Sequence, residues 1–510
     1  MTRKMVTLFL ALALVLTMVP AVVNAEAAPA QIPWFIGVSE SADQGIVNDA
    51  INAYLAEKGI NAQVTLNFGT GDEYWGQIVT RINSGEDLGI IGFGSQTKLD
   101  YVVRSQSGAY YPLDGDDALL DTYGTGTKAL FDQGVWDAMK IGGHIYGIPT
   151  LKDNGFYISL IYNDTLAQEL GVDIDGFKFE SFRDIEDLAY EVKEKRDAAH
   201  PDWADYPVLW NVEAVHPYNF AVENFLNGSF FAVCNVPGID TIAGYDNETV
   251  FNIYDTPEYL EYAIQKQKMV EDGIYLYDYT DKREQQYTGA VFGWVGWGYT
   301  YMEEHMYGDN FVTKMRMFDK TWTDTNNFFS AGTAISANCA TPDVAMQILE
   351  LVNTDADFAT MMRFGIEGEH WTTDADGKMT FEGTKNAVAG ERAYYYWYMA
   401  PVGNLTIVHA PETLTGPDSV MLKNMMALND SCIKAAHLGF SFETTPVMNQ
   451  IAACTAVEQE YKGDLNRGQL ADADEVTDIV SEFVEKLNAN GVADVIAEVQ
   501  SQLEAWKAAK

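Results

Sequence analysis

The segment IPWFIGV (32–38) decides the fold, because it begins a regular alternation of buried strands and amphipathic helices. The helical spacing of ADQGIVNDAINAYLAEKG (42–59) follows it, and NAQVTLNFG (61–69) alternates as a strand. A second helix, DEYWGQIVTRINSGE (72–86), leads into the apolar run LGIIGFGS (88–95). Strands that alternate with helices are typical of βαβ units in a parallel sheet. An α/β fold is therefore predicted.

The same alternation returns twice further along the chain. HIYGIPT (144–150) and GFYISLIYN (155–163) read as strands, and SFRDIEDLAYEVKEKRDAA (181–199) as a helix. After a middle region rich in helices and aromatic residues, FFSAGTAIS (328–336) and TPDVAMQILELVNTD (341–355) form another strand and helix. This order predicts two lobes, with the chain passing between them more than once.

The C-terminal 36 residues, EVTDIVSEFVEKLNANGVADVIAEVQSQLEAWKAAK, are predicted to be helical with a break at Asn490-Gly491. Their apolar residues form stripes with helical periodicity, which indicates packing against a core. A helix that binds a partner is the alternative. The stripe residues are Ile479, Phe483, Leu487, Val492, Val495, Ile496, Val499 and Leu503.

The N-terminus is typical of a secretory signal peptide. The basic residues Arg3 and Lys4 precede the apolar run 5–23, and Val23-Asn24-Ala25 fits the small-residue cleavage rule. We expect export, cleavage after Ala25 and a mature chain of ~485 residues, a length typical of two or three domains. A retained anchor is the alternative, since ~19 apolar residues are about enough to cross a bilayer.

The net charge and the number of cysteines argue against several classes of function and site for this sequence. With 32 basic and 74 acidic residues, the net charge of −42 disfavours nucleic acid and polyanionic substrates. It is compatible with neutral or cationic ligands, or with solubility alone. Four cysteines are too few for a disulfide scaffold, and no C-x-x-C pair supports a zinc ribbon. Cys339 and Cys454 are expected to be buried thiols, while a Cys432–Cys454 bridge remains an open alternative.

No motif supports catalysis or a cofactor. The glycines of LGIIGFGS miss the G-x-G-x-x-G spacing, and neither a G-x-S-x-G elbow nor a P-loop occurs. TTDADGKMTFEG (372–383) has Thr372 and Gly383 where a calcium loop needs strong oxygen ligands, so a hairpin turn is predicted instead. We expect no enzyme activity, no cofactor and no metal.

The stretch FGIEGEHW (364–371) places Glu367 and Glu369 beside His370, which suggests a metal site or an acid–base pair. H-E-x-x-H spacing is absent, and no second histidine lies within helical reach. Two glutamates this close in sequence cannot by themselves be the separated carboxylates of a glycosidase.

Aromatic residues are the most informative feature for function. Phe, Trp and Tyr make up 13% of the chain and gather at residues 74–75, 208–220, 293–301 and 393–399. Flat aromatic faces bind sugar rings with little loss of side-chain entropy. In GWVGWG (293–298), the flanking glycines are expected to leave the indoles uncovered.

Several motifs resemble those of the bacterial extracellular solute-binding proteins of family 1, the receptors of ABC importers. They are WDAMKIGGHIYGIP (136–149), SLIYNDTLAQELGVDIDGFKFESFRDIEDL (159–188) and SAGTAISANCATPDVAMQILELVN (330–353). GIEGEHW (365–371) and GFSFETTPVMNQIAACTAVEQEY (439–461) resemble the LplA-like branch, whose members carry a DUF3502-type C-terminal region.

The resemblance implies the type II periplasmic-binding-protein-like fold, with the ligand cleft between two α/β lobes joined by crossing segments. It implies a signal peptide at 1–25, a first lobe of 26–150 plus 325–385, and a second lobe of 151–324 plus 386–510. The DUF3502-like region is placed at 437–510 within the second lobe. Crossings are expected near 149–154, 322–330 and 381–391, and GIEGEHW is expected to be a structural turn.

Ligand-binding residues are transferred from the loops that face the cleft in this family. The first lobe is expected to supply Ser39, Glu40, Phe93, Gly94 and Ser95, and the hinge Lys152, Asp153 and Tyr157. The second lobe is expected to supply Trp210 and Asn211, with Trp294, Trp297 and Trp397 as stacking residues.

The predicted function is a monomeric extracellular receptor that delivers a carbohydrate, an oligosaccharide in the first instance, to the permease subunits of an ABC transporter. The sequence lacks a lipobox cysteine at the cleavage site, so a periplasmic or secreted location stands beside the cell surface. The alternatives are a peptide or polyamine receptor of the same fold, a secreted glycoside-active enzyme, and a sensory accessory protein.

Overall fold

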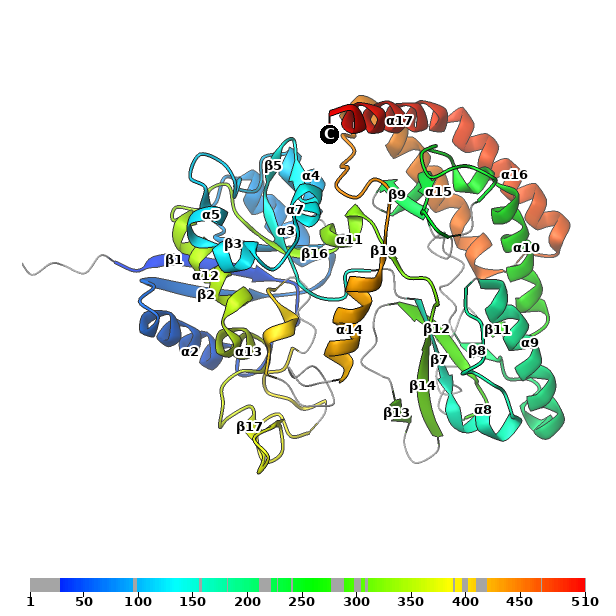
Figure 1. Ribbon diagram of the computed structural model, residues 1–510, viewed down its shortest axis with the longest axis horizontal. Coiled ribbons are helices and arrows are strands. Elements are labelled where there is room, and N and C mark those ends of the chain that lie inside the picture. Colours follow the sequence, from blue (N-terminus) through cyan, green and yellow to red (C-terminus); the bar gives the residue numbers. More distant parts are fainter. Residues whose placement is uncertain are drawn as a thin grey trace, which may run out of the picture.

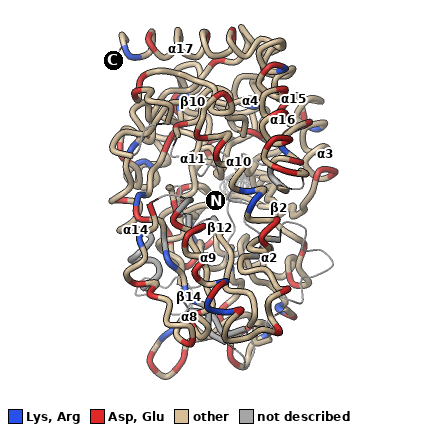
Figure 2. Tube along the Cα trace, turned by 90° about the vertical axis from the view of Figure 1, so that its right-hand side faces the viewer, with Lys and Arg blue, Asp and Glu red and all other residues tan. Residues whose placement is uncertain are grey.

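The computed structural model describes residues 28–509 except 95–98, 156–157, 181, 211–221, 227, 240–241, 277–288, 298–303, 308–310, 389, 397–401, 410–419 and 469. The predicted signal peptide lies outside the described residues. Figure 1 shows two lobes side by side, with the C-terminal helices packed on the second. Figure 2 shows Asp and Glu spread over both lobes and the C-terminal helices, consistent with the net charge of −42.

A five-stranded sheet forms the centre of the first lobe, in the order β2-β1-β3-β16-β6. β1 is parallel to β2 and β3, whereas β16 is antiparallel to both β3 and β6. Every residue of β3 and β16 is buried, which explains why their sequences are apolar or small throughout. The bounds are β1 Ala30–Ile36, β2 Ala62–Phe68, β3 Ile90–Gly94, β16 Ala331–Ile335 and β6 Gly147–Pro149.

Amphipathic helices cover this sheet. α2 buries Val47, Ile51 and Leu55 at helical spacing, so one stripe of the helix packs on the sheet. The larger helices are α2 Gln44–Glu57, α3 Gly71–Asn83, α12 Pro342–Thr354 and α13 Ala356–Phe364. Shorter elements are α4 Tyr101–Gln106, α5 Leu119–Tyr123, α6 Thr125–Lys128, α7 Gln133–Ala138, β4 Lys140–Ile141 and β5 His144–Ile145.

The second lobe is built on a six-stranded sheet in the order β11-β8-β12-β7-β14-β13. β8 runs parallel to β12, and β7 runs antiparallel to both β12 and β14. Its strands are β7 Ile158–Asn163, β8 Leu209–Trp210, β11 Tyr275–Leu276, β12 Gly293–Trp297, β13 Glu304–Tyr307 and β14 Phe311–Met317. Its helices are α8 Asp164–Leu170, α9 Phe182–Ala199 and α10 Pro257–Glu271.

The C-terminal helices pack on the hairpin of β9 (Val222–Leu226) and β10 (Ser229–Asn235) and form a core of their own with it. α16 and α17 bury Phe483, Leu487, Val495, Val499 and Leu503, so the predicted core-packing stripe is confirmed. The predicted break falls between these two helices, where Gly491 has a positive φ of 89°. The helices are α15 Met448–Arg467, α16 Ala473–Ala489 and α17 Val492–Ala509.

Four buried cysteines are all free, as predicted for Cys339 and Cys454. The alternative Cys432–Cys454 bridge is therefore absent. The TTDADGKMTFEG segment is the predicted hairpin, in which β17 (Thr372–Thr373) pairs with β18 (Met379–Thr380). Asp374 closes its turn by accepting hydrogen bonds from the amides of Asp376 and Lys378, both at 2.9 Å.

The third connection between the lobes differs from the one expected at 381–391. Tyr394 and Val402 pack in the core of the first lobe, although the expected boundary assigned residues from 386 onward to the second. After Asn404, which pairs with Leu151, the chain stays on the first lobe: Val408 packs with Ala359 and Phe364 of α13, and the His409 amide donates to the Thr360 hydroxyl at 2.8 Å. α14 (Val420–Ser431) follows after residues 410–419, which lie outside the described residues. β19 (Ile433–Lys434) then pairs with β15 (Trp322–Thr323). Burial of Tyr394 in the core of the first lobe explains the shift, which family spacing alone did not reveal.

Candidate ligand-binding site

The topology brings the carboxyl edges of both sheets to the crossing segments. The first crossing leaves β6 at Pro149, and Pro149 pairs with Gly332 at the start of β16. Ala331 in turn pairs with Gly94, the last residue of β3. Since β6 and β3 are both antiparallel to β16, their carboxyl ends share one edge. Ligands bind at this edge in open α/β sheets.

The second sheet meets the crossings in the same way. β7 begins at Ile158, directly after the first crossing, and Ile158 pairs with Trp297 at the end of β12. Met317, where β14 ends before the second crossing, pairs with Ser159. The carboxyl end of β12 therefore adjoins the crossing segments, as do those of β3 and β6.

Hydrogen bonds join the three crossing segments to one another. The Asn429 amide donates to the carbonyl of Lys152 and accepts from the amide of Asn154, both at 2.8 Å. Thr323 donates to the carbonyl of Asn154 at 2.6 Å. Lys152 is buried and its ammonium lies 3.2 Å from an Asp153 carboxylate oxygen. Lys152 and Asp153 thus belong to the hinge; their contact with a ligand stays a prediction.

Ser39 and Glu40 are exposed on the loop that follows β1, at the edge facing the crossings. Two aromatic residues frame this loop. The Tyr396 hydroxyl donates to the carbonyl of Ser39, and Trp75, in the first turns of α3, lies over Gly37. A Cβ added at Gly37 would lie 2.4 Å from the Trp75 ring, so glycine is needed for this approach. Trp75 and Tyr396 are half-buried, which leaves part of each ring accessible.

Phe93 and Gly94 end β3 at the same edge, and both are buried. The Phe93 ring turns inward, 4.7 Å from the ring of Tyr101, and fills the space that Gly147 and Gly332 leave open. Its backbone, and not its ring, therefore lies at the edge.

In the second lobe, Trp297 ends β12 opposite Ile158, so the backbone places it at the edge beside the crossings. Trp210 ends β8 and is level with Trp294 in the sheet, because Leu209 pairs with Gly293. Trp294 is half-buried within β12. Gly293 allows a close approach of β7, since a Cβ there would lie 2.2 Å from the Ile161 carbonyl oxygen; whether the glycines leave the indoles open to a ligand stays a prediction. The remaining predicted residues, Ser95, Tyr157, Asn211 and Trp397, lie outside the described residues.

The GIEGEHW segment is a turn that holds the Ser39–Glu40 loop. His370 is fully buried, and its Nδ1 accepts a hydrogen bond from the amide of Ile366 at 3.0 Å. This bond leaves the proton on Nε2, which lies 3.1 Å from a carboxylate oxygen of Asp43 at the end of the same loop. The amide of Asp43 also donates to the carbonyl of Ala393 at 3.2 Å. These contacts fix the loop from one side.

Asp43, Glu369 and His370 present ligand atoms within 4.8 Å of one another, which is metal-like spacing. The Lys385 ammonium stands between the two carboxylates, 2.8 Å from Asp43 and 2.9 Å from Glu369. The hydrogen bond from Lys385 is the main cause that holds the pKa of Asp43 below its usual value, and His370 adds to it. A lysine cation thus takes the place between these carboxylates, and the cluster acts as a structural clamp.

Replacing His370 with alanine should cost about 2–4 kcal/mol of folding free energy, because it leaves a cavity and an unpaired buried amide. Thermal unfolding of the purified chain measures this loss. The matched control, Lys385→Met, removes an exposed partner of the same Asp43 and should cost clearly less. Equal losses would contradict the assignment of the clamp to the buried histidine.

Comparison with known proteins agrees with this architecture. Residues 436–508 match the model of a domain of unknown function, DUF3502. A carbohydrate ABC transporter substrate-binding protein of Streptococcus pneumoniae serotype 4 is 24% identical over 464 residues, covering 88% of this chain and 85% of the relative.

Two solved structures show the same fold at low identity. The N-glycan transport solute-binding protein of Streptococcus pneumoniae has a TM-score of 0.73 at 20% identity, covering 93% of this chain and 98% of that one. An HMO-binding ABC-transporter-associated solute-binding protein of Bifidobacterium longum infantis has a TM-score of 0.58 at 14% identity, covering 94% and 99%. The resemblance drawn from the sequence motifs is confirmed: this chain has the two-lobe fold of the extracellular solute-binding proteins, and its C-terminal region is a DUF3502 domain.

Proposed function

We propose that the protein is an extracellular receptor that binds an oligosaccharide between its lobes and delivers it to an ABC transporter. The observation that carries this is the pair Trp75 and Tyr396, which frame the exposed Ser39–Glu40 loop at the carboxyl edge of the first sheet. Partly open aromatic rings beside hydroxyl and carboxylate groups suit sugar rings, which have both apolar faces and hydroxyls.

The relatives indicate which oligosaccharides to test first. The Streptococcus pneumoniae N-glycan transport protein was solved in complex with Man1GlcNAc and with Man5GlcNAc. Another structure of this fold, with a TM-score of 0.57, is described as a substrate-binding protein in complex with kestose. We infer a preference for short or branched oligosaccharides. In this role the protein works by binding and closure, without catalysis.

A cationic peptide or polyamine is the second candidate ligand. Glu40 is exposed on the ligand-facing loop, and the net charge of −42 favours the approach of cations. A carboxylate in the site attracts ammonium groups, whereas the aromatic rings favour neutral sugars, so the two ligand classes make different demands on the same loop.

Export and partnership with permease subunits complete the proposal. They rest on the N-terminal sequence and on the naming of the relative as an ABC transporter protein. Among the residues that the structure describes, no helix combines the length and the apolar character needed to cross a bilayer.

A thermal-shift screen distinguishes the candidates. A ligand at about a thousand times its Kd adds roughly 4 kcal/mol to folded-state stability, which raises the melting temperature by several degrees. We expect a shift with Man5GlcNAc or another neutral oligosaccharide, and none with spermidine or short peptides. A shift with spermidine or peptides alone would replace the sugar with a cationic ligand. Shortening of the oligosaccharide during incubation would point to a glycoside-active enzyme.

A further inference from the structure

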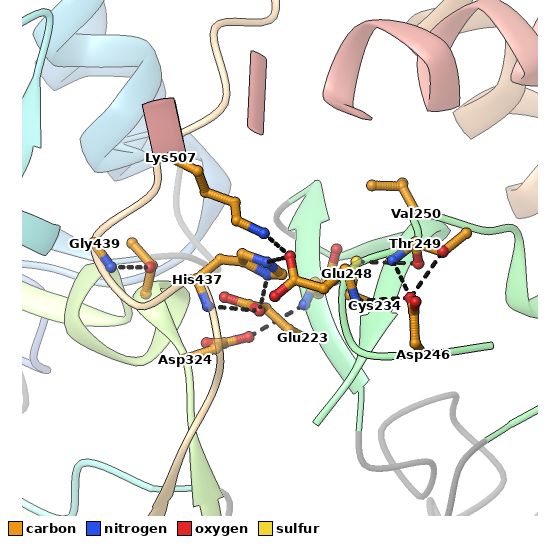
Figure 3. Close-up of polar contacts among 12 residues, drawn as sticks. Glu223, Cys234, Asp246, Glu248, Thr249, Val250, Asp324, His437, Gly439 and Lys507 are labelled. Carbon is orange, nitrogen blue, oxygen red and sulfur yellow. Dashed lines mark hydrogen bonds and ion pairs between the residues drawn. The ribbon is translucent and has the colours of Figure 1, made fainter. Parts of the chain in front are cut away.

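A cluster of buried ionisable residues lies where the C-terminal domain meets the crossing segments (Figure 3). Glu223, Asp324 and His437 are each 1% exposed. The Nδ1 of His437 lies 2.8 Å from Glu223, whose same oxygen accepts the His437 amide at 3.2 Å. The other oxygen of Glu223 is buried and has no hydrogen-bond partner among the described residues. Charges buried this deeply need compensation from one another.

The cluster joins elements that are far apart in the sequence. Glu223 lies on β9, and Asp324 caps α11 (Thr325–Phe329) in the second crossing, accepting from the amide of Asn327 at 3.2 Å. Asp324 also accepts from the amide of Asn224 on β9 at 3.3 Å. His437 lies in the third connection, three residues after β19.

The C-terminal domain supplies the histidine and the lysine of the cluster. His437 stands at the start of the DUF3502 region and Lys507 at its end. Both residues contact Glu248. The Nε2 of His437 lies 3.4 Å from a carboxylate oxygen of Glu248, and Lys507 forms an ion pair with the same carboxylate. Both ring nitrogens of His437 therefore face carboxylates, and both can donate only when the ring is protonated. The two ends of the domain thus close on Glu248 together.

Further contacts hold the same connection. The amide of Gly439 donates to the hydroxyl of Thr325 at 3.0 Å, directly beside Asp324. The amide of Ala435 donates to the carbonyl of Thr323 at 2.9 Å. The third connection and the start of the C-terminal domain are therefore hydrogen-bonded to the second crossing on both sides of Asp324.

We propose that the DUF3502 domain is a working part of the hinge, and that Glu223, Asp324 and His437 form the joint through which it holds the crossing segments. Closure of a two-lobed receptor changes the backbone at its crossing segments. A joint that fixes two of these segments to a third body sets how far, and how easily, the lobes move. The inference concerns the hinge and does not depend on which ligand is bound.

The joint is sensitive to pH through Asp324. Burial, followed by the nearby Glu223, raises the pKa of Asp324 to about 7. Because this pKa is above the usual 3.8, the contribution of protonated Asp324 to folding stability is complete below about pH 4. That contribution is lost as the pH rises through 7. With Asp324 neutral, Glu223 bonds the His437 ring and Glu248 pairs with Lys507, so each carboxylate has a partner. When Asp324 ionises, an extra negative charge faces Glu223 and loosens the joint.

Two other titratable residues, Cys234 and Asp246, lie near the joint. Cys234 on β10 bonds the Thr249 carbonyl at 3.2 Å, and Asp246 accepts the Thr249 amide at 2.9 Å. Neither makes a hydrogen bond to Asp324 or His437 in the described structure. Replacing Asp324 by asparagine keeps the oxygen that caps α11 and removes the titration, together with the oxygen that accepts from the Asn224 amide.

Distance measurements between the lobes test the proposal. Cysteines introduced for Glu57 on α2 and Glu194 on α9 are exposed positions for a fluorophore pair, while the four natural cysteines are buried. Single-molecule energy transfer is recorded on the purified full chain without ligand, from pH 5 to pH 8.5. We expect the distribution of distances between the two labels to shift or broaden as the pH rises, and the midpoint of this change to lie near pH 7. In Asp324→Asn it should keep its low-pH form throughout.

The controls separate the joint from general effects on folding. Glu458 is a buried carboxyl of the same domain that bonds Tyr254 inside the C-terminal core, so Glu458→Gln should retain the wild-type pH response. His437→Gln should broaden the distribution at every pH; Lys507→Met at the rim tests the same contact if that variant fails to fold. A wild-type distribution that does not change with pH, or a response retained in Asp324→Asn, would overturn the proposal.

Discussion

Replacing Arg196 with leucine should lower the stability of the second lobe by about 3–5 kcal/mol, because it leaves buried partners without a charge or a donor. Arg196 on α9 is fully buried. It donates to the carbonyls of Tyr206, Pro207 and Ala290 at 2.8–3.0 Å. Two further bonds, at 3.0 and 2.9 Å, go to one oxygen of Asp197. These bonds join the helix to the segments that lead into β8 and β12.

Thermal unfolding followed by circular dichroism measures this loss, which corresponds to a fall of roughly 10 °C in the melting temperature. Arg196→Lys should recover only part of it, since an ammonium cannot span three carbonyls and a carboxylate. The matched control is Arg81→Leu, which removes a half-exposed ion pair with Glu86 and should cost at most about 1 kcal/mol. Similar losses for the two leucine variants would contradict the role given to Arg196.

Gly89→Ala should destabilise the first lobe by about 2–4 kcal/mol. Gly89 precedes β3 with a φ of 56°, and a Cβ there would lie 2.4 Å from the carbonyl oxygen of Pro33 on β1. The added methyl group is therefore both strained in its backbone and forced against a neighbouring strand. The register between β1 and β3, in which Trp34 pairs with Ile90, would have to open.

Gly85→Ala separates these two causes. Gly85 also has a positive φ, of 77°, but nothing lies within 4 Å of its added Cβ. This variant should show only the backbone cost of about 1–2 kcal/mol. Urea unfolding of both variants gives the comparison. If the two variants lost the same stability, steric contact with Pro33 would not be the reason for glycine at position 89.

Periodicity was sufficient to predict the strands of the first lobe and the C-terminal helices, because their apolar residues follow local geometry. Most of the segment IPWFIGV forms β1, and the stripe from Phe483 to Leu503 packs in the core of the C-terminal helices. The aromatic segment 394–396 carries no such local signal for its lobe. Its place became clear only from contacts such as the Tyr394 hydroxyl with the Met362 carbonyl, at 2.9 Å.

The candidate site was predictable at the level of loops but not of contacts. Ser39 and Glu40 are exposed on the loop after β1, at the carboxyl edge of the sheet, and their contact with a ligand stays a prediction. The sequence identifies Trp75 only as one of two adjacent aromatic residues, and Gly37, against which its ring packs, is the local signal for this contact. The buried joint was not predicted at all. Glu223 and His437 are 214 residues apart, and no spacing rule connects residues at that distance.

Calorimetric titration of Man5GlcNAc into the wild-type chain and into Trp75→Ala tests the central claim most directly. The receptor assignment predicts saturable one-to-one binding for the wild type and at least about tenfold weaker binding for Trp75→Ala, equivalent to about 1.4 kcal/mol. Tyr123→Ala, which removes an exposed aromatic on α5 away from the strand edge, should bind like the wild type. Absence of heat with this and other neutral oligosaccharides, together with binding of a polyamine or peptide, would contradict the assignment.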